Sequence, residues 1–250
     1  MVLRGIVGRL GGKSRLCKEI VTYFPTHEVY VEPFVGGGSI FFQKAPSPME
    51  VINDLDSDVL SIYQDILIVP DEVFQNYKFN NNGELFYKLR DEFPTEPEER
   101  LYRNLCLSYL SFGSNRRNFC KTRVREVFGG YLKRHLKDYK ERLKDCKIHN
   151  EDYKKVIERY DGEGTFFYLD PPYSDKQKSW CYIDCVEVRD VYETLKNIKG
   201  KFLLSYDDSD IVRQTFKDYF IKEVHTKWFL HGGGQGKQKV ELLISNYELE

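Results

Sequence analysis

The tetrapeptide Asp170-Pro171-Pro172-Tyr173 combines residue types suited to chemistry on an exocyclic amine. Such an amine is a poor nucleophile when conjugated to a purine ring, because its lone pair is delocalised. The Asp170 carboxylate can accept a hydrogen bond from the amine and draw its nitrogen toward tetrahedral geometry, while the prolines stiffen the turn and aim the Pro171 carbonyl. Tyr173 offers a face on which a flipped base can stack. This combination favours a catalytic role over a merely rigid turn.

A second pattern joins a glycine turn to an acidic residue. Gly36-Gly37-Gly38 follows an apolar segment, and glycines let a ligand approach the backbone closely. Asp54 lies 18 residues beyond Gly36, near the spacing at which a carboxylate accepts hydrogen bonds from ribose hydroxyls. The full G-x-G-x-x-G fingerprint is absent, so an adenosine-containing ligand other than a nicotinamide cofactor fits better. A plain turn between strand and helix fits this pattern equally well.

A parallel sheet would bring these residues together. The glycine turn, Asp54 and Asp170 each follow a short apolar segment typical of a buried strand, and open α/β sheets carry their sites at the carboxyl ends of strands. The sequence predicts strands at 29–34, 50–53, 146–150, 165–169, 201–205 and 240–247. Helices are expected to begin at 40–44 and to cover 60–66, 131–145 and 153–159. The expected fold class is therefore α/β.

Charge is distributed unevenly, although the formal net charge is only −1. Residues 50–99 contain 13 Asp and Glu against 3 Lys and Arg, whereas residues 100–147 contain 14 Lys and Arg against 4 Asp and Glu. A basic segment of this kind predicts a local surface for a polyanion. From about Pro70 to His135 polar turns also alternate with aromatic and basic residues, which indicates an inserted domain. We expect this domain at 66–136, between the two parts of a catalytic domain at 1–65 and 137–250.

The remaining composition narrows the class of protein. The six cysteines are scattered, and no Cys/His cluster has zinc spacing, so no metal is expected. The first residues lack the apolar stretch of a signal peptide, and no run approaches the length of a membrane span. The sequence therefore predicts a cytoplasmic, reduced protein without a metal. We also expect a monomer in solution.

Further segments carry a family resemblance. They are Gly11-Gly12-Lys13, the loop Glu32-Pro33-Phe34-Val35-Gly36-Gly37-Gly38-Ser39, the acidic pair Asn53-Asp54, the tetrapeptide at 170–173 and the segment Glu241-Leu242-Leu243-Ile244-Ser245-Asn246-Tyr247. In this order they resemble the motifs of the Dam-like DNA adenine-N6 methyltransferases over nearly the whole chain. One departure is Arg9-Leu10, where the family usually has an aromatic residue and an alanine.

The resemblance implies a Rossmann-like S-adenosylmethionine-dependent methyltransferase fold. This fold is a mixed central sheet with helices on both faces, and the insertion would be a mostly helical target-recognition domain. The implied activity is site-specific transfer of a methyl group from S-adenosylmethionine to N6 of a flipped adenine in double-stranded DNA, with S-adenosylhomocysteine as product. The amine would attack directly, without a covalent intermediate. Such enzymes occur in restriction-modification systems of prokaryotic or phage-infected cells.

The resemblance also implies roles for single residues. Asp170, Pro171, Pro172 and Tyr173 would be catalytic. The expected cofactor-binding residues are Arg9, Lys13, Phe34, Gly36, Asp54, Asp152 and Asp170. The expected DNA-binding residues, from a loop that would enter the duplex, are Ser114, Asn115, Arg116, Arg117, Asn118, Lys121, Arg123 and Arg125. Arginine can bond bidentately to guanine and asparagine to adenine, whereas most of the lysines would contact phosphate.

The recognition loop departs from the family at one position. The family has a tyrosine where this chain has Ser114, which leaves Phe112 or Phe119 as the wedge beside the target base. The stretch from Lys133 to Lys147 fits a solvated helix face as well as a phosphate-binding surface.

Other functions share part of this pattern. The same chemistry could act on RNA or on a protein amide, although an asparagine in place of Asp170 would be typical for amides. A catalytically inactive DNA-binding or cofactor-sensing relative is a further hypothesis, against which the intact Asp170, Tyr173, Lys13 and Asp54 argue. An NAD-dependent dehydrogenase is the weakest alternative, because no acid/base pair for hydride transfer accompanies the glycine turn.

Overall fold

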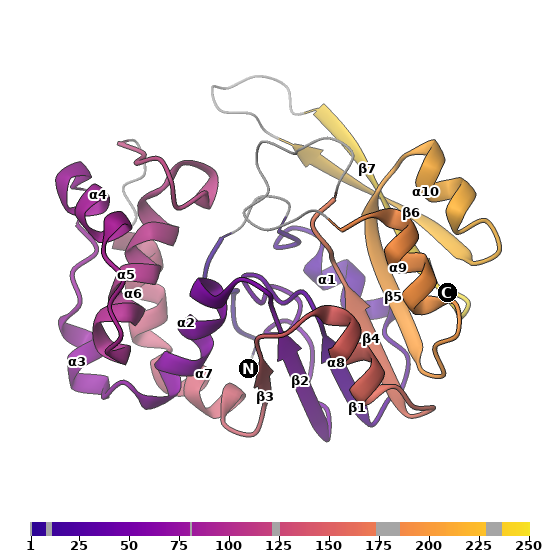
Figure 1. Cartoon of the computed structure of the whole chain (residues 1–250), viewed down its shortest axis with the longest axis horizontal. Coiled ribbons are helices and arrows are strands. Elements are labelled where there is room, and N and C mark those ends of the chain that lie inside the picture. The colour runs from indigo at the N-terminus through magenta and orange to yellow at the C-terminus, as the bar shows by residue number, and fades with distance from the viewer. Residues whose placement is uncertain (1, 9–11, 81, 122–125, 174–185, 229–236) are drawn as a thin grey trace.

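The computed structural model describes residues 2–8, 12–80, 82–121, 126–173, 186–228 and 237–250. Within these residues the centre of the molecule is a seven-stranded sheet of order β3-β2-β1-β4-β5-β7-β6 (Figure 1). The strands are β1 (Val29–Glu32), β2 (Met49–Asn53), β3 (Lys147–His149), β4 (Thr165–Leu169), β5 (Lys201–Asp207), β6 (Phe220–Trp228) and β7 (Lys237–Ser245).

The sheet is mixed, with one reversed strand. Neighbours from β3 to β5 pair in parallel, whereas β7 runs antiparallel to both β5 and β6. Because β2, β1 and β4 are adjacent and parallel, their carboxyl ends meet at one edge of the sheet. This edge carries Asp54, the glycine loop and Asp170.

Helices cover both faces of the sheet. Alternate residues of β4 belong to different core clusters: Phe166 and Tyr168 pack with α2, α5 and α7, whereas Phe167 and Leu169 pack with α8, α9 and α10. The helices are α1 (Cys17–Ile20), α2 (Ser57–Ile68), α3 (Asp71–Asn76), α4 (Gly83–Asp91), α5 (Pro97–Leu110), α6 (Glu126–Arg134), α7 (Leu136–Leu143), α8 (Tyr153–Tyr160), α9 (Val188–Leu195) and α10 (Asp210–Thr215), with short 3-10 turns η1 (Val21–Tyr23) and η2 (Phe112–Ser114). The predicted Rossmann-like fold is thus confirmed.

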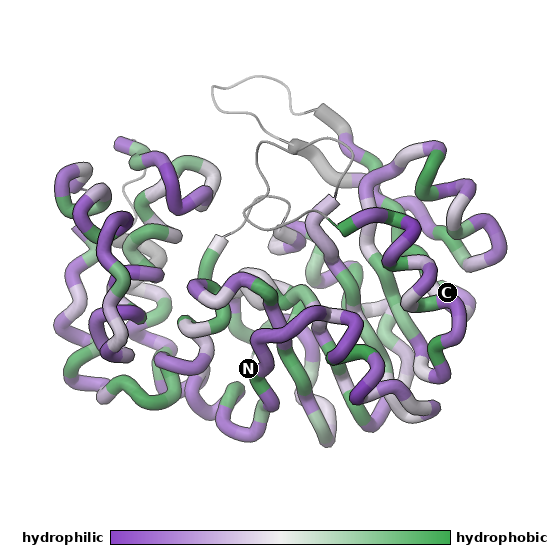
Figure 2. Tube along the Cα trace, viewed as in Figure 1, coloured by the Kyte–Doolittle hydropathy of each residue, from purple (hydrophilic) through white to green (hydrophobic). Residues whose placement is uncertain are grey.

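Hydropathy follows this layering. Figure 2 shows apolar residues along the central strands, whereas the outer helices carry hydrophilic stretches. Of the helices that the structure describes, none combines the length and apolar character that a membrane crossing requires.

Three details differ from the sequence predictions. Residues 40–44 form turns and no helix, since Ala45-Pro46 follows and proline neither donates an N–H nor tolerates a helical residue before it. The helix expected at 131–145 is divided into α6 and α7 at His135. Strand β6 was not predicted, because its sequence FIKEVHTKW has neither a continuous apolar run nor a regular alternation of apolar and polar residues.

The helices α3 to α6 lie together at one end of the molecule, beside α2 and away from β4 to β7 (Figure 1). They contain most of the segment 66–136, whose boundaries as a separate recognition domain stay a prediction. A bidentate ion pair fastens this helical group to α2. Arg100 of α5 donates to Asp65 through Nη2 at 2.6 Å and Nε at 2.9 Å, and Asp65 has no measurable exposure.

We expect Arg100→Met to lower the free energy of unfolding by about 3 kcal/mol, because it leaves the buried Asp65 carboxylate without its cation. Denaturant unfolding measures this loss, and the double variant Asp65→Asn/Arg100→Met should recover part of it. The control is Lys88→Met on α4, which removes an exposed pair with Glu92 at 3.7 Å and should leave the midpoint unchanged. Equal midpoints for Arg100→Met and wild type would contradict the argument.

Candidate active site

Four polar side chains meet at the carboxyl end of β4. Lys13 Nζ donates to Asp170 Oδ1 at 2.5 Å and to the Tyr173 hydroxyl at 3.0 Å, and it lies 2.7 Å from Glu241 Oε1. The Tyr173 hydroxyl lies 2.9 Å from Asp170 Oδ1 and 2.8 Å from Glu241 Oε1. One lysine therefore holds two carboxylates and a phenol, which come from distant parts of the chain.

The charges of this cluster shift the pKa values of its members. Burial raises the pKa of Asp170, and the nearby Glu241 adds to the rise, while Lys13 opposes it. Burial alone would lower the pKa of Lys13, but the attraction of Asp170 and Glu241 outweighs burial and raises it. Lys13 is consequently a permanent cation, and Asp170 is a carboxylate that takes up a proton more readily than usual.

Tyr173 is held by its ring as well as by its hydroxyl. Its ring stacks on that of Tyr206, on β5, with centroids 4.5 Å apart. The backbone of this turn is also fixed, since the Pro172 carbonyl accepts from the Val186 amide at 3.2 Å. Pro171 is buried and Pro172 half-buried. The tetrapeptide is thus a rigid turn whose aspartate and tyrosine are fixed in position.

A second buried carboxylate lies behind the cluster. Glu32, the last residue of β1, accepts from the Tyr30 hydroxyl at 2.6 Å. Burial, together with the negative charge of Asp170, raises the pKa of Glu32 to about 8. At neutral pH Glu32 is therefore mostly protonated, and the surplus negative charge at this end of the sheet comes from Asp170 and Glu241, which share the cation of Lys13. This surplus suits a cationic ligand.

The glycine loop and the acidic end of β2 contact each other directly. The Gly36 amide donates to Asp54 Oδ2 at 2.8 Å, and the Asp56 amide donates to Asp54 Oδ1 at 2.9 Å. Tyr63 of α2 donates to the Gly36 carbonyl at 2.7 Å. Gly36 and Gly38 have φ values of 49° and 73°, which other residues rarely adopt. Each Asp54 oxygen keeps a lone pair for a further donor.

Two more expected cofactor residues lie around α8. The half-buried Phe34 packs on the ring of Tyr153, with centroids 5.0 Å apart. Asp152 is exposed and caps α8 by accepting from the Lys154 amide at 2.8 Å. Arg9 and Gly11 lie outside the described residues.

The expected DNA-binding residues differ in exposure. Arg117, Asn118 and Lys121 are exposed. Ser114 and Asn115 are buried, and Asn115 Oδ1 accepts from the amides of residues 117 and 118 at 3.0 Å, so it shapes the loop. Arg116 forms ion pairs with Asp56 and Asp58. Arg123 and Arg125 lie outside the described residues.

Sequence reasoning did not assign Glu241 or Tyr206 to the site. Glu241 was noted only as the first residue of the closing strand, yet it is buried among apolar neighbours of β7. A glutamate inside an apolar strand is the signal that could have identified it, since buried carboxylates need a partner. Nothing in its surroundings marks Tyr206. Among the described residues, no group of His, Cys, Asp or Glu is arranged to hold a metal ion.

Comparisons with known proteins agree with this arrangement. The chain is 26% identical to a Type II methyltransferase of Lactococcus lactis subsp. cremoris, and the alignment covers 98% of this chain and 96% of that protein. It is 25% identical to the DNA adenine methylase of Escherichia coli (strain K12), over 95% and 93% of the two chains. It is 24% identical to a Type II methyltransferase of Paramecium bursaria Chlorella virus NC1A, over 98% and 100%.

Among solved structures, a precorrin-6y C5,15-methyltransferase from Geobacter metallireducens GS-15 superposes with a TM-score of 0.39 at 6% identity, over 93% of this chain and 84% of that one. A superposition with so low a TM-score does not support a fold assignment, which rests instead on the strand order described above. Residues 10–228 match the family described as D12 class N6 adenine-specific DNA methyltransferase. The chain therefore belongs to the D12 class of N6 adenine-specific DNA methyltransferases.

Proposed function

We propose that this methyltransferase takes its methyl group from S-adenosylmethionine and transfers it to N6 of an adenine flipped out of double-stranded DNA, by direct attack of the amine. The observation that carries the proposal is the cluster of Lys13, Asp170, Tyr173 and Glu241 beside the glycine loop. It combines an acceptor for the amine with a charge pattern that favours a cation.

The residues at the sheet edge fit S-adenosylmethionine in three respects. The Asp54 carboxylate keeps lone pairs for ribose hydroxyls after its two backbone bonds. Phe34 offers a half-buried aromatic face for adenine, with Asp152 nearby as a partner for its amine. The surplus carboxylates around Lys13 suit the positive methionine end. When bound, the cofactor supplies a methyl group on a sulfonium, which is already a strong electrophile.

Asp170 would act on the target amine. Its carboxylate accepts a hydrogen bond from N6 and localises the lone pair toward the methyl group. Methylation releases one proton from the amine. The raised pKa of Asp170 makes its carboxylate a suitable first acceptor for that proton. Lys13 and Tyr173 keep the carboxylate in place and exclude water from its buried side.

The recognition loop would supply the DNA contacts. Arg117, Asn118 and Lys121 are exposed there and can reach a duplex without rearrangement. Phe112 is 41% exposed at the same loop, whereas Phe119 packs on Phe86 with ring centroids 5.7 Å apart. We therefore favour Phe112 as the wedge that fills the space of the flipped adenine. We also propose that the protein acts as a monomer.

The test combines methyl transfer with base flipping. Plasmid DNA is methylated with labelled cofactor and the modified adenines are mapped, and 2-aminopurine is then placed at a mapped adenine. We expect binding to raise its fluorescence, and Phe112→Ala to reduce that rise while binding of unmodified DNA falls by less than about tenfold. Phe220→Ala is the matched control, since it removes a phenylalanine that is 49% exposed on β6, the edge strand at the other end of the strand order from β3.

Label on adenine N6 that depends on Asp170, together with a fluorescence rise, would support the proposal. Transfer of the labelled methyl group to RNA, and not to DNA, would show that the substrate is RNA. An unchanged fluorescence rise in Phe112→Ala would exclude Phe112 as the wedge.

A further inference from the structure

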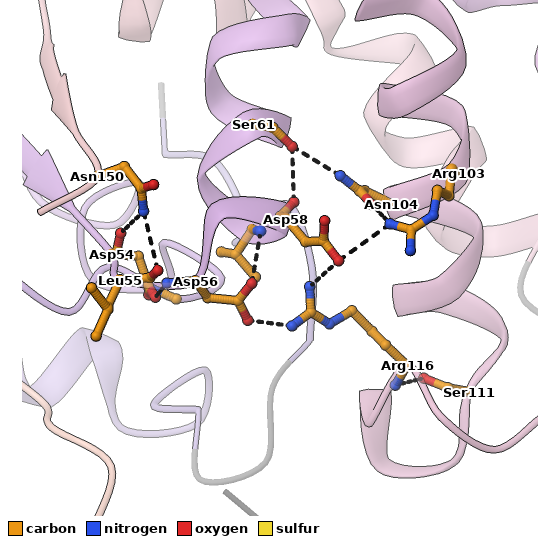
Figure 3. A network of polar contacts seen from close by, with 12 residues as sticks. Asp54, Leu55, Asp56, Asp58, Ser61, Arg103, Asn104, Ser111, Arg116 and Asn150 are labelled. Atoms are coloured by element: carbon orange, nitrogen blue, oxygen red, sulfur yellow. Dashed lines mark hydrogen bonds and ion pairs between the residues drawn. The ribbon is translucent and has the colours of Figure 1, made fainter. Parts of the chain in front are cut away.

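The acidic turn after β2 connects the proposed cofactor site to the recognition loop. The Asp54 carboxylate accepts hydrogen bonds from the backbone amides of Gly36 and Asp56. The Asp56 carboxylate in turn forms an ion pair with the Arg116 guanidinium (Figure 3). Asp58, in the first turn of α2, lies 3.5 Å from Arg116 Nη1. Two carboxylates from one turn therefore hold the same arginine.

Arg116 is fixed to the loop as firmly as to the turn. Its backbone amide donates to Ser111 Oγ at 2.9 Å, and its φ of 53° lies in a region that costs energy for an arginine. Its side chain is only 12% exposed. To reach a guanine, the guanidinium would have to break its ion pair with Asp56, which is only 7% exposed, and breaking a buried ion pair is costly.

The neighbouring helix is fastened at the same place. Arg103 of α5 donates to Asp58 Oδ2 at 3.2 Å and to Asn104 Oδ1 at 2.6 Å, and Asn104 donates in turn to Ser61 Oγ at 2.8 Å (Figure 3). Arg103 also reaches the Leu89 carbonyl of α4 at 2.9 Å. The acidic turn is thus the joint at which α2, α4, α5 and the recognition loop meet.

A second contact links the recognition loop to the segment just before Lys13, an expected cofactor-binding residue. Ser114 lies against Gly8, where an added Cβ would be 3.0 Å from the serine hydroxyl oxygen. Just before the loop, Tyr109 donates to the Ile6 carbonyl at 3.0 Å. The segment that leads to Lys13 and the turn that carries Asp54 therefore both touch the recognition loop.

From these contacts we infer that Arg116 is a positioning residue, which couples cofactor binding at Asp54 to DNA binding on the loop through its ion pair with Asp56. This role differs from the base contact expected from the sequence. It rests on the proposed function, because it takes Asp54 as the ribose-binding residue. A ligand that orders Asp54 orders Asp56 and so the loop, and by reciprocity DNA on the loop strengthens cofactor binding.

The experiment measures the Kd of S-adenosylhomocysteine with and without a duplex that contains the mapped target sequence. In wild type we expect the duplex to tighten this Kd by about fivefold or more. Arg116→Gln and Asp56→Asn should each bring the ratio near one, and the double variant should behave like either single variant. Asp56→Asn is chosen because asparagine keeps the cap on α2, where Asp56 accepts from the Val59 amide at 3.3 Å.

Two further variants separate coupling from loss of structure or of DNA contacts. Arg116→Lys keeps the charge and should restore part of the ratio, which a merely structural defect would not allow. Arg117→Gln, at the exposed neighbouring arginine, should raise the KM for DNA without changing the ratio. In Arg116→Gln we expect kcat at saturating DNA and cofactor to fall less than KM rises.

Several results would overturn the inference. One is a wild-type ratio of one, and another is additive effects of Arg116→Gln and Asp56→Asn. A third is a changed methylation sequence in Arg116→Gln alone, which would make Arg116 a base reader. The proposed function fails separately, if wild type does not bind S-adenosylhomocysteine or if Asp54→Ala binds it as tightly as wild type.

Discussion

Replacing Asp170 by alanine is expected to lower kcat by about a hundredfold to a thousandfold, the range found when a single charge-stabilising group is removed from an active site. The variant loses the acceptor that orients the amine. Its fold should persist, because Lys13 keeps Glu241 as a partner at 2.7 Å. Single-turnover methylation of DNA with saturating cofactor measures the chemical step directly.

Two variants sharpen this result. Asp170→Asn keeps an oxygen acceptor and removes the charge, so its kcat should lie between those of wild type and Asp170→Ala. Asp190→Ala removes an aspartate whose side chain is 58% exposed on α9 and should leave kcat unchanged. If Asp170→Ala turned over as fast as Asp190→Ala, Asp170 would have no part in the reaction.

The second large effect is expected at Lys13, and it has a pH signature. Lys13→Met removes the cation that opposes the raised pKa of Asp170, so this pKa should rise further. If the ionised carboxylate is the active form, activity is lost as pH falls through that pKa, and the acid limb of kcat/KM moves to higher pH. We expect kcat/KM for the cofactor to fall by about a hundredfold as well.

Glu241→Gln provides the opposite change at the same cluster. It removes a negative neighbour that raises the pKa of Asp170, so the acid limb should move to lower pH. Glutamine is nearly isosteric and still accepts from Tyr173, which keeps the cluster in place. Shifts in the same direction for Lys13→Met and Glu241→Gln would contradict the charge argument.

Much of the fold follows from local patterns. The apolar run of β4 is bounded by polar residues on both sides, and its predicted limits agree with the structure. The glycine loop, Asp54 and Asp170 could be placed at one sheet edge because each follows a buried strand, and parallel strands end together. Strand β6 was missed, since its pattern has meaning only beside β7.

The site was predicted only where a motif is contiguous. Lys13, Asp54, Asp170 and Tyr173 stand in segments that imply a role at the site. The segment that begins with Glu241 implies only a closing strand, and Glu241 reaches the site through the pairing of β5 with β7. The contact of Arg116 with Asp56 is of the same kind. An exposed basic loop and an acidic helix start each fit a solvated surface, and only the packing of α5 against α2 brings them together.

The place of β7 in the sheet has a consequence for biosynthesis. Strand β7 lies between β5 and β6, although β6 precedes it in the chain, so on the ribosome β6 reaches the sheet only after β7 has been made. The same strand brings Glu241 to Lys13. A nascent polypeptide that already contains the glycine loop and Asp170 thus still has an unfinished charge cluster, and the cluster and the sheet are both completed only when β7 pairs with β5.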